Sequence, residues 1–202
     1  MSSVELELPP AWSRFPIAPD GARRAQRQLL EDWYADHTVP ADRRETATTC
    51  LVRESRQASR EGIGFAAVLF LDLDDPGADA QHQLVVGSLT VSFRTLPHAD
   101  DPAVAAQGTL DVLRGQRSGG GYATRRLELV GLGRDSARPA VLLREQLPDP
   151  ETGTRVAVSQ VLWLIPGSHQ LASVAVATPN RDLAPAFTEL ALGVASGLRV
   201  TA

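Results

Sequence analysis

The chain has 202 residues and a net charge of −4, from 24 acidic and 20 basic residues. Its contents of 43% hydrophobic and 22% charged residues are close to globular averages, which argues against global disorder. The acidic balance gives no reason to expect nucleic-acid binding, which needs a concentrated basic face, and the single cysteine excludes an intrachain disulfide.

The first residues carry acids and prolines, and they lack the basic and apolar regions of a secretory signal. No stretch approaches the roughly 18 consecutive apolar residues that a membrane span needs. We therefore expect a cytoplasmic protein with no membrane partner. The length fits one α+β domain over residues 1–202.

The N-terminal third predicts one short strand and then a helical segment over residues 20–61, packed on or beside a sheet. Val4–Leu8 alternates apolar and acidic residues, as in an edge strand. An irregular, proline-punctuated stretch around Trp12 follows, and its aromatic residues pin the N-terminus to the core. Helices are predicted over Ala22–Asp36 and Ala41–Glu61, the second of them only weakly amphipathic.

From residue 63 onward the pattern changes to apolar, β-branched runs that predict strands. The two strands of a hairpin are followed by a helix over Pro102–Arg117, with Asp101 as its N-cap. Pro166 and Gly167 supply a tight turn between the last two strands. The predicted strands are Gly64–Leu73, Leu84–Phe93, Tyr122–Leu132, Ala137–Leu147, Thr154–Ile165 and His169–Thr178.

A closing amphipathic helix is predicted over Asp182–Leu198. Its apolar residues recur at helical spacing on one face; they are Phe187, Leu190, Ala191, Val194 and Leu198. The fold class is therefore α+β, with a mainly antiparallel sheet of about six strands flanked by helices. Runs without polar alternation, such as Val161–Ile165, indicate that helices cover both faces of the sheet centre.

This order of elements resembles the PsbP-like α/β/α sandwich superfamily, which includes LpqN-type actinobacterial proteins. The residues that carry the resemblance are Val161–Gly167, Ser173–Thr178, Pro179-Asn180, Leu183–Val200 and the opening Pro10–Pro16. The resemblance implies an α/β/α sandwich and a non-enzymatic, protein-binding role. Cys50 does not follow a signal peptide as a lipobox cysteine does, so no membrane anchor is implied.

Three patterns could carry chemistry, and each has a simpler structural interpretation. The acidic loop at residues 72–79 lacks the twelfth-position glutamate of a calcium-binding loop. The glycines at 119–121 follow a helix, whereas phosphate-binding loops precede one. Ser168 and His169 lie in a turn without a nucleophile-elbow motif. We therefore predict no catalytic residue, no cofactor and no metal site.

The arginines of the weakly amphipathic segment Ala41–Glu61 are candidates for binding a partner, and so are Trp33 and Tyr34 if they are exposed rather than in the core, because both residue types are enriched at interface hot spots. Arg125 and Arg126 could add to an anion-binding surface, although a solvated face is the simpler interpretation. The candidate partner-binding residues are Trp33, Tyr34, Arg43, Arg44, Arg53 and Arg56.

We expect a non-enzymatic accessory, adaptor or chaperone-like protein that binds another protein. One alternative is a small-ligand-binding protein or enzyme with a cleft between the sheet and its helices. A second alternative is an immunity or antitoxin-type protein, which the acidic balance permits. The sequence does not specify the partner or the oligomeric state.

Overall fold

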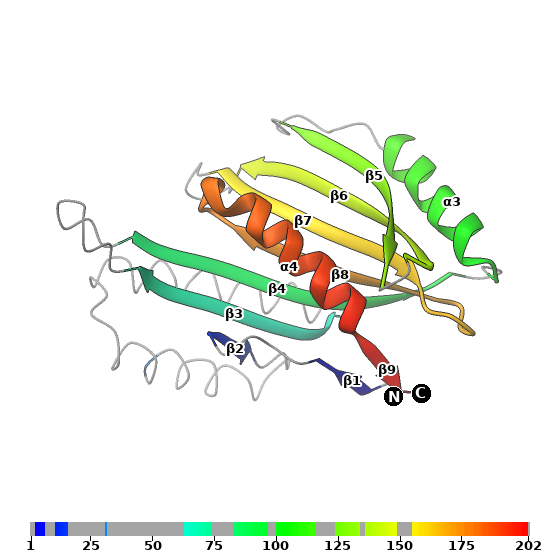
Figure 1. The fold of residues 1–202 in the computed structure, drawn as a ribbon, viewed down its shortest axis with the longest axis horizontal. Coiled ribbons are helices and arrows are strands. Elements are labelled where there is room, and N and C mark those ends of the chain that lie inside the picture. The colour runs from blue at the N-terminus through cyan, green and yellow to red at the C-terminus, as the bar shows by residue number, and fades with distance from the viewer. Residues whose placement is uncertain are drawn as a thin grey trace.

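An antiparallel sheet of seven strands forms the centre of the part of the chain that the structure describes (Figure 1). This computed structural model describes residues 3–6, 11–15, 31, 63–73, 83–96, 100–115, 124–133, 136–148 and 155–201. The elements are β1 (Ser3–Glu5), β2 (Trp12–Phe15), β3 (Ile63–Leu73), β4 (Gln83–Thr95), α3 (Pro102–Gly115), β5 (Arg125–Leu132), β6 (Arg138–Pro148), β7 (Arg155–Leu164), β8 (Gln170–Thr178), the 3₁₀ turn η1 (Arg181–Leu183), α4 (Ala184–Gly197) and β9 (Arg199–Thr201).

The strand order is β2-β3-β4-β8-β7-β6-β5, and every neighbouring pair is antiparallel. After β4 the chain passes through α3 to the far edge of the sheet, and it then returns strand by strand until β8 pairs with β4. Sequence neighbours are therefore sheet neighbours everywhere except at this crossover. Short β1 and β9 pair with each other in a separate two-stranded sheet.

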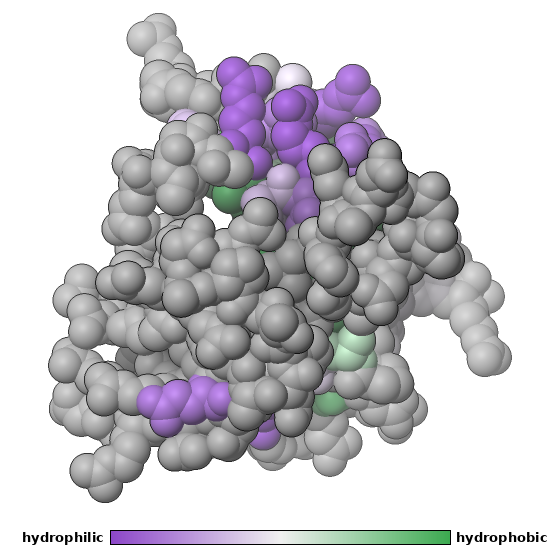
Figure 2. Space-filling model, turned by 90° about the vertical axis from the view of Figure 1, so that its left-hand side faces the viewer, coloured by the Kyte–Doolittle hydropathy of each residue, from purple (hydrophilic) through white to green (hydrophobic). Residues whose placement is uncertain are grey.

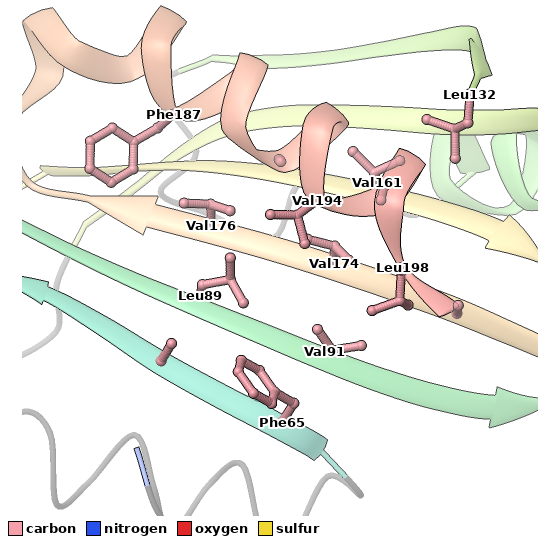
Figure 3. Close-up of a cluster of buried hydrophobic side chains, with 14 of the residues drawn as sticks. Phe65, Leu89, Val91, Leu132, Val161, Val174, Val176, Phe187, Val194 and Leu198 are labelled. Atoms are coloured by element: carbon pink, nitrogen blue, oxygen red, sulfur yellow. The ribbon is translucent and has the colours of Figure 1, made fainter. Parts of the chain in front are cut away.

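Helix α4 covers one face of the sheet and holds the main hydrophobic core (Figure 3). Phe187, Ala191 and Val194 of α4 are buried against the sheet, as the helical spacing predicted. The ring of Phe187 lies 6.3 Å from that of Trp12, which comes from β2 at the other end of the chain. Pro185 lies in the first turn of α4, where it costs no intrahelical hydrogen bond.

The second helix, α3, packs mainly on β6. Its residues Ala106 and Leu110 form a small cluster with Val141, whereas the adjacent Leu142 belongs to the α4 core. Successive residues of a strand point to opposite faces, so α3 and α4 lie on opposite sides of the sheet. The predicted coverage of both faces is confirmed here.

Two local predictions are confirmed by hydrogen bonds. The side chain of Asp101 accepts from the backbone N–H groups of Ala103 at 2.7 Å and Val104 at 3.3 Å, which caps α3. In the predicted turn, Gly167 has a φ of +71° and the N–H of Ser168 donates to the carbonyl of Ile165. The α+β class is likewise confirmed.

The strand count was underestimated. Trp12–Phe15 was expected to be irregular, but it forms β2, because its antiparallel pairing with β3 satisfies backbone groups that a four-residue pattern does not signal. The predicted strand Val4–Leu8 overlaps β1 at Val4 and Glu5, while Glu7 and Leu8 lie outside the described residues, and the partner strand β9 was not expected. The helical segment 20–61 lies outside the described residues, apart from helical Glu31. Within the described residues, no helix is both long and apolar enough to span a membrane.

Candidate functional site

The predicted partner-binding residues lie outside the part of the chain that the structure describes. These are Trp33, Tyr34, Arg43, Arg44, Arg53 and Arg56, and their role stays a prediction. The glycines at 119–121 and most of the acidic loop after Asp72 also lie outside it.

Ser168 and His169 are described, and their contacts belong to a turn. The hydroxyl of Ser168 donates to the carbonyl of Ile165 at 3.0 Å and accepts from the N–H of Gln170 at 3.2 Å. The exposed His169 lies 3.3 Å from the carboxylate of Asp100. Because the Ser168 proton is committed to a backbone carbonyl, the hydroxyl holds the turn in shape.

A cavity of about 550 Å³ opens where α4 begins, against the ends of β5, β6 and β7. Figure 2 views the molecule from the end that carries this opening, and hydrophilic side chains gather on its upper part. The lining residues are Thr124, Arg126, Arg144, Glu145, Gln146, Ala157, Val158, Ser159, Ala184, Pro185, Ala186, Thr188 and Glu189. We refer to this cavity as the α4 cleft.

Three polar residues form a row across the sheet on the α4 side. Arg126 of β5 is the register partner of Arg144 of β6, and Arg144 is the partner of Ser159 of β7. Directly opposed residues have Cα atoms about 5 Å apart, and like charges so placed repel each other. The two arginines therefore need a nearby anion.

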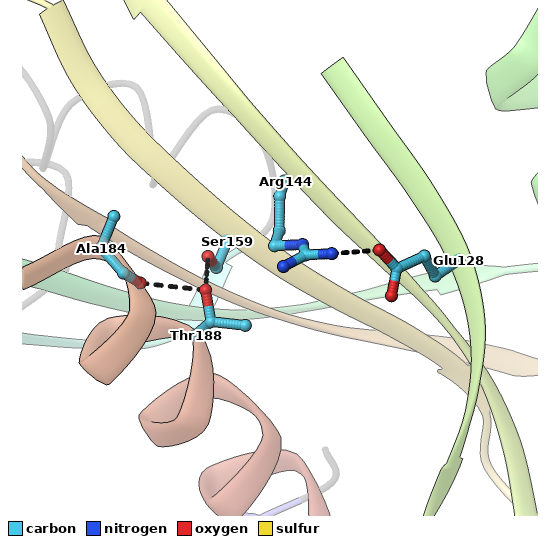
Figure 4. A network of polar contacts seen from close by, with 5 residues as sticks. All are labelled: Glu128, Arg144, Ser159, Ala184 and Thr188. Atoms are coloured by element: carbon cyan, nitrogen blue, oxygen red, sulfur yellow. Dashed lines mark hydrogen bonds and ion pairs between the residues drawn. The ribbon is translucent and has the colours of Figure 1, made fainter. Parts of the chain in front are cut away.

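Glu128 supplies part of that negative charge. It lies two residues beyond Arg126 on the same face of β5, and it pairs with a terminal nitrogen of Arg144 (Figure 4). The Nε of Arg144 is buried and has no acceptor in the described part of the chain. A buried N–H without an acceptor costs free energy, so an oxygen atom that entered the cleft and reached this donor would remove that cost.

The hydroxyls on the cleft floor are already committed to each other. Thr188 Oγ1 donates to the carbonyl of Ala184 at 3.0 Å, so the 2.7 Å contact between Thr188 and Ser159 is a bond that Ser159 donates (Figure 4). Both protons are used, and among the described residues neither hydroxyl forms a hydrogen bond with a basic group. This pair fixes α4 to β7.

A joint anion-binding surface of Arg125 and Arg126 was one possibility, but the two side chains point to opposite faces of β5. Arg126 faces the α4 cleft, whereas Arg125 lies 3.7 Å from Glu145 on the other face. Burial raises the pKa of Glu145 above the ordinary glutamate value, and the positive charge of Arg125 lowers it by less. The neighbouring arginines thus belong to two different environments.

The fold and the cleft define an α+β protein with an arginine-lined cleft between its sheet and its last helix. No family model matches the chain, and no curated protein matches it significantly. Among solved structures, it is similar to the crystal structure of LpqN, which is involved in cell envelope biogenesis of Mycobacterium tuberculosis. The TM-score is 0.48 at 14% sequence identity, and the match covers 100% of this chain and 85% of that chain. Membership of the PsbP-like superfamily stays a prediction.

Proposed function

We propose that the protein is a non-enzymatic accessory protein that binds another protein, and that a carboxylate on an exposed segment of that partner enters the α4 cleft. The observation that carries this proposal is the buried Nε of Arg144, which has no acceptor among the described residues and belongs to a side chain that lines a cavity of about 550 Å³. Arginine recognises carboxylates through pairs of parallel N–H donors.

The charges around the cleft favour a single carboxylate over a multiply charged phosphate. On the sheet face that carries Arg126 and Arg144, these two arginines face one glutamate, Glu128, which leaves one positive charge in excess. Glu145 also lines the cavity, but it is paired with Arg125 on the other face. Glu189 on α4 adds a negative charge to the opposite wall. An anion with two or more charges would be repelled by both glutamates, whereas one carboxylate balances the arginine side.

A binding role also agrees with the hydroxyl pair on the floor. Activation of a serine or threonine needs an adjacent base that accepts its proton. Ser159 gives its proton to Thr188, and Thr188 gives its own to the carbonyl of Ala184. The pair therefore supports a structural role for both side chains.

Location of the protein in the cytoplasm is part of the same proposal.

A small carboxylic acid is the second candidate ligand, because the cavity volume lies within the range of about 300–1,000 Å³ that is usual for small-molecule sites. The recognition chemistry is the same in both cases, namely a carboxylate on Arg144. Only the molecule that carries the carboxylate differs.

The direct test follows the Nε–H signal of Arg144 by nuclear magnetic resonance. The probes are a capped Ala-Glu-Ala peptide, the matching Ala-Gln-Ala peptide and free glutarate, each at constant ionic strength. We expect the glutamate peptide to shift the Arg144 signal and the glutamine peptide to leave it unchanged. A shift with glutarate alone would select the small-acid candidate, and no shift with any probe would refute carboxylate binding.

The partner is tested by cross-linked capture from the native host, with wild type, Arg144→Gln and Arg114→Gln as bait. Arg114 is exposed on α3 and serves as the matched control. We expect one stoichiometric protein with wild type and Arg114→Gln, and its loss with Arg144→Gln. Equal capture by all three baits would contradict a role for the cleft.

A further inference from the structure

Strand β5 is a long edge strand. It pairs with β6 on one side and with no other strand in the described part of the chain. It has eight residues, whereas β2 at the opposite edge has four. Long edge strands are templates for pairing with another chain unless they are covered or interrupted.

The hydrogen-bond pattern shows which backbone groups of β5 face outward. The N–H of Gln146 donates to the carbonyl of Thr124 at 3.1 Å, so this opposed pair is hydrogen-bonded. Antiparallel pairs alternate between bonded and non-bonded, which turns the backbone groups of Leu127 and Leu129 away from β6. The side chain of Leu129 is also 51% exposed, which is unusual for a large apolar residue.

The charges on this edge are complementary to the same edge of a second copy. Arg126 and Glu128 flank Leu127 on one face of the strand. If two β5 strands pair antiparallel about a two-fold axis at Leu127, Arg126 of each copy lies opposite Glu128 of the other, in closely spaced non-bonded pairs. Two favourable cross-strand charge pairs result.

Other two-fold registers are less favourable. A two-fold axis at Arg126 places the Arg126 side chains of the two copies directly opposite each other, and an axis at Glu128 does the same for the two Glu128 side chains. Like charges then meet, which is unfavourable. An axis at Arg125 also opposes like charges. Of the registers centred on Arg125, Arg126, Leu127 and Glu128, only the one centred on Leu127 brings opposite charges together.

We propose that two copies of the chain pair through β5 in this register, which joins their sheets into one continuous antiparallel sheet. This interface goes beyond the proposed carboxylate site. It gives Arg126 a carboxylate partner, and Glu128 lies between Arg144 of its own copy and Arg126 of the second. Each pair of arginines still exceeds its glutamate by one positive charge, so both copies keep a cleft that can bind a carboxylate.

The interface is tested by sedimentation velocity across micromolar to millimolar concentrations of the full chain. We expect a reversible dimer for wild type. Arg126→Glu and Glu128→Arg, tested separately, should each weaken dimerisation by roughly tenfold, because both charge pairs become repulsive. Mixing these two variants should restore the dimer, because every opposed pair in the mixed complex then has opposite charges.

Arg114→Glu on exposed α3 is the control for net charge, and it should dimerise like wild type. Circular dichroism monitors folding. If Glu128→Arg fails to fold beside Arg144, Glu128→Gln replaces it as a single variant that removes both charge pairs and should weaken dimerisation. The double variant Arg126→Glu/Glu128→Arg should dimerise again. A monomeric wild type, single reversals without effect, or a mixture that stays monomeric would each overturn the proposal.

Discussion

The contact between Phe187 and Gly87 gives the sharpest test of how α4 is seated on the sheet. Gly87 lies in β4, directly beneath the ring of Phe187. A Cβ atom at position 87 would overlap Cε1 of that ring, and it would lie 2.9 Å from Cζ and 3.2 Å from Cη2 of Trp12. The absence of a side chain at Gly87 thus provides the space that the ring fills.

Two substitutions, Phe187→Ala and Gly87→Ala, probe this fit alone and together. Phe187 is only 7% exposed, and its truncation should lower the free energy of unfolding by about 3–5 kcal/mol. Gly87→Ala overpacks the same space and should cost about 1–3 kcal/mol. In the Phe187→Ala background the added methyl enters the vacated space, so Gly87→Ala should cost nothing there. The expected coupling is about 1–3 kcal/mol.

The assay is urea unfolding followed by tryptophan fluorescence, with the slope of the transition checked for constancy among the variants. Gly193→Ala in α4 is the control, because no atom of the described residues lies within 4 Å of the added Cβ. It should be neutral or stabilising, since alanine favours the helix. Additive costs for Gly87→Ala and Phe187→Ala would refute the reasoning that the glycine is needed for the ring.

Two further predictions concern polar groups. Thr188→Val should lower the free energy of unfolding by about 1–3 kcal/mol, because the buried Ser159 hydroxyl loses its acceptor. The double variant Thr188→Val/Ser159→Ala should lose less stability, because no hydroxyl is then left without an acceptor. Thermal unfolding of the single and the double variant measures the difference. Burial raises the pKa of Glu145, so the folded state holds this proton at pH values where the unfolded chain has released it. The stability of wild type relative to Glu145→Gln should therefore fall as the pH rises from the ordinary glutamate value of about 4.3 through the raised pKa. Urea unfolding at several pH values measures this difference in unfolding free energy. A difference that does not change with pH would contradict the burial effect.

The sequence predicted those elements that have a local signal, such as the spacing of apolar residues or a capping residue. The helical spacing of the apolar residues from Phe187 onward identified the buried face of α4, and Asp101 marked the start of α3. Strand β2 was missed because four residues after two prolines show too little alternation. Its position depends on pairing with β3, about fifty residues further along the chain, and local propensity does not report such contacts.

The cleft could not be predicted from the sequence for a related reason. Arg126, Arg144 and Ser159 are separated along the chain, and they form one row only because the registers of β5 with β6 and of β6 with β7 align them. A shift of either register by one residue would turn one of these side chains to the other face. The adjacent arginines Arg125 and Arg126 could have formed one anion-binding surface, but strand geometry places them on opposite faces. Identifying β5 and β6 as strands was therefore insufficient to find the site, because the pairing register determines which charges face the cleft.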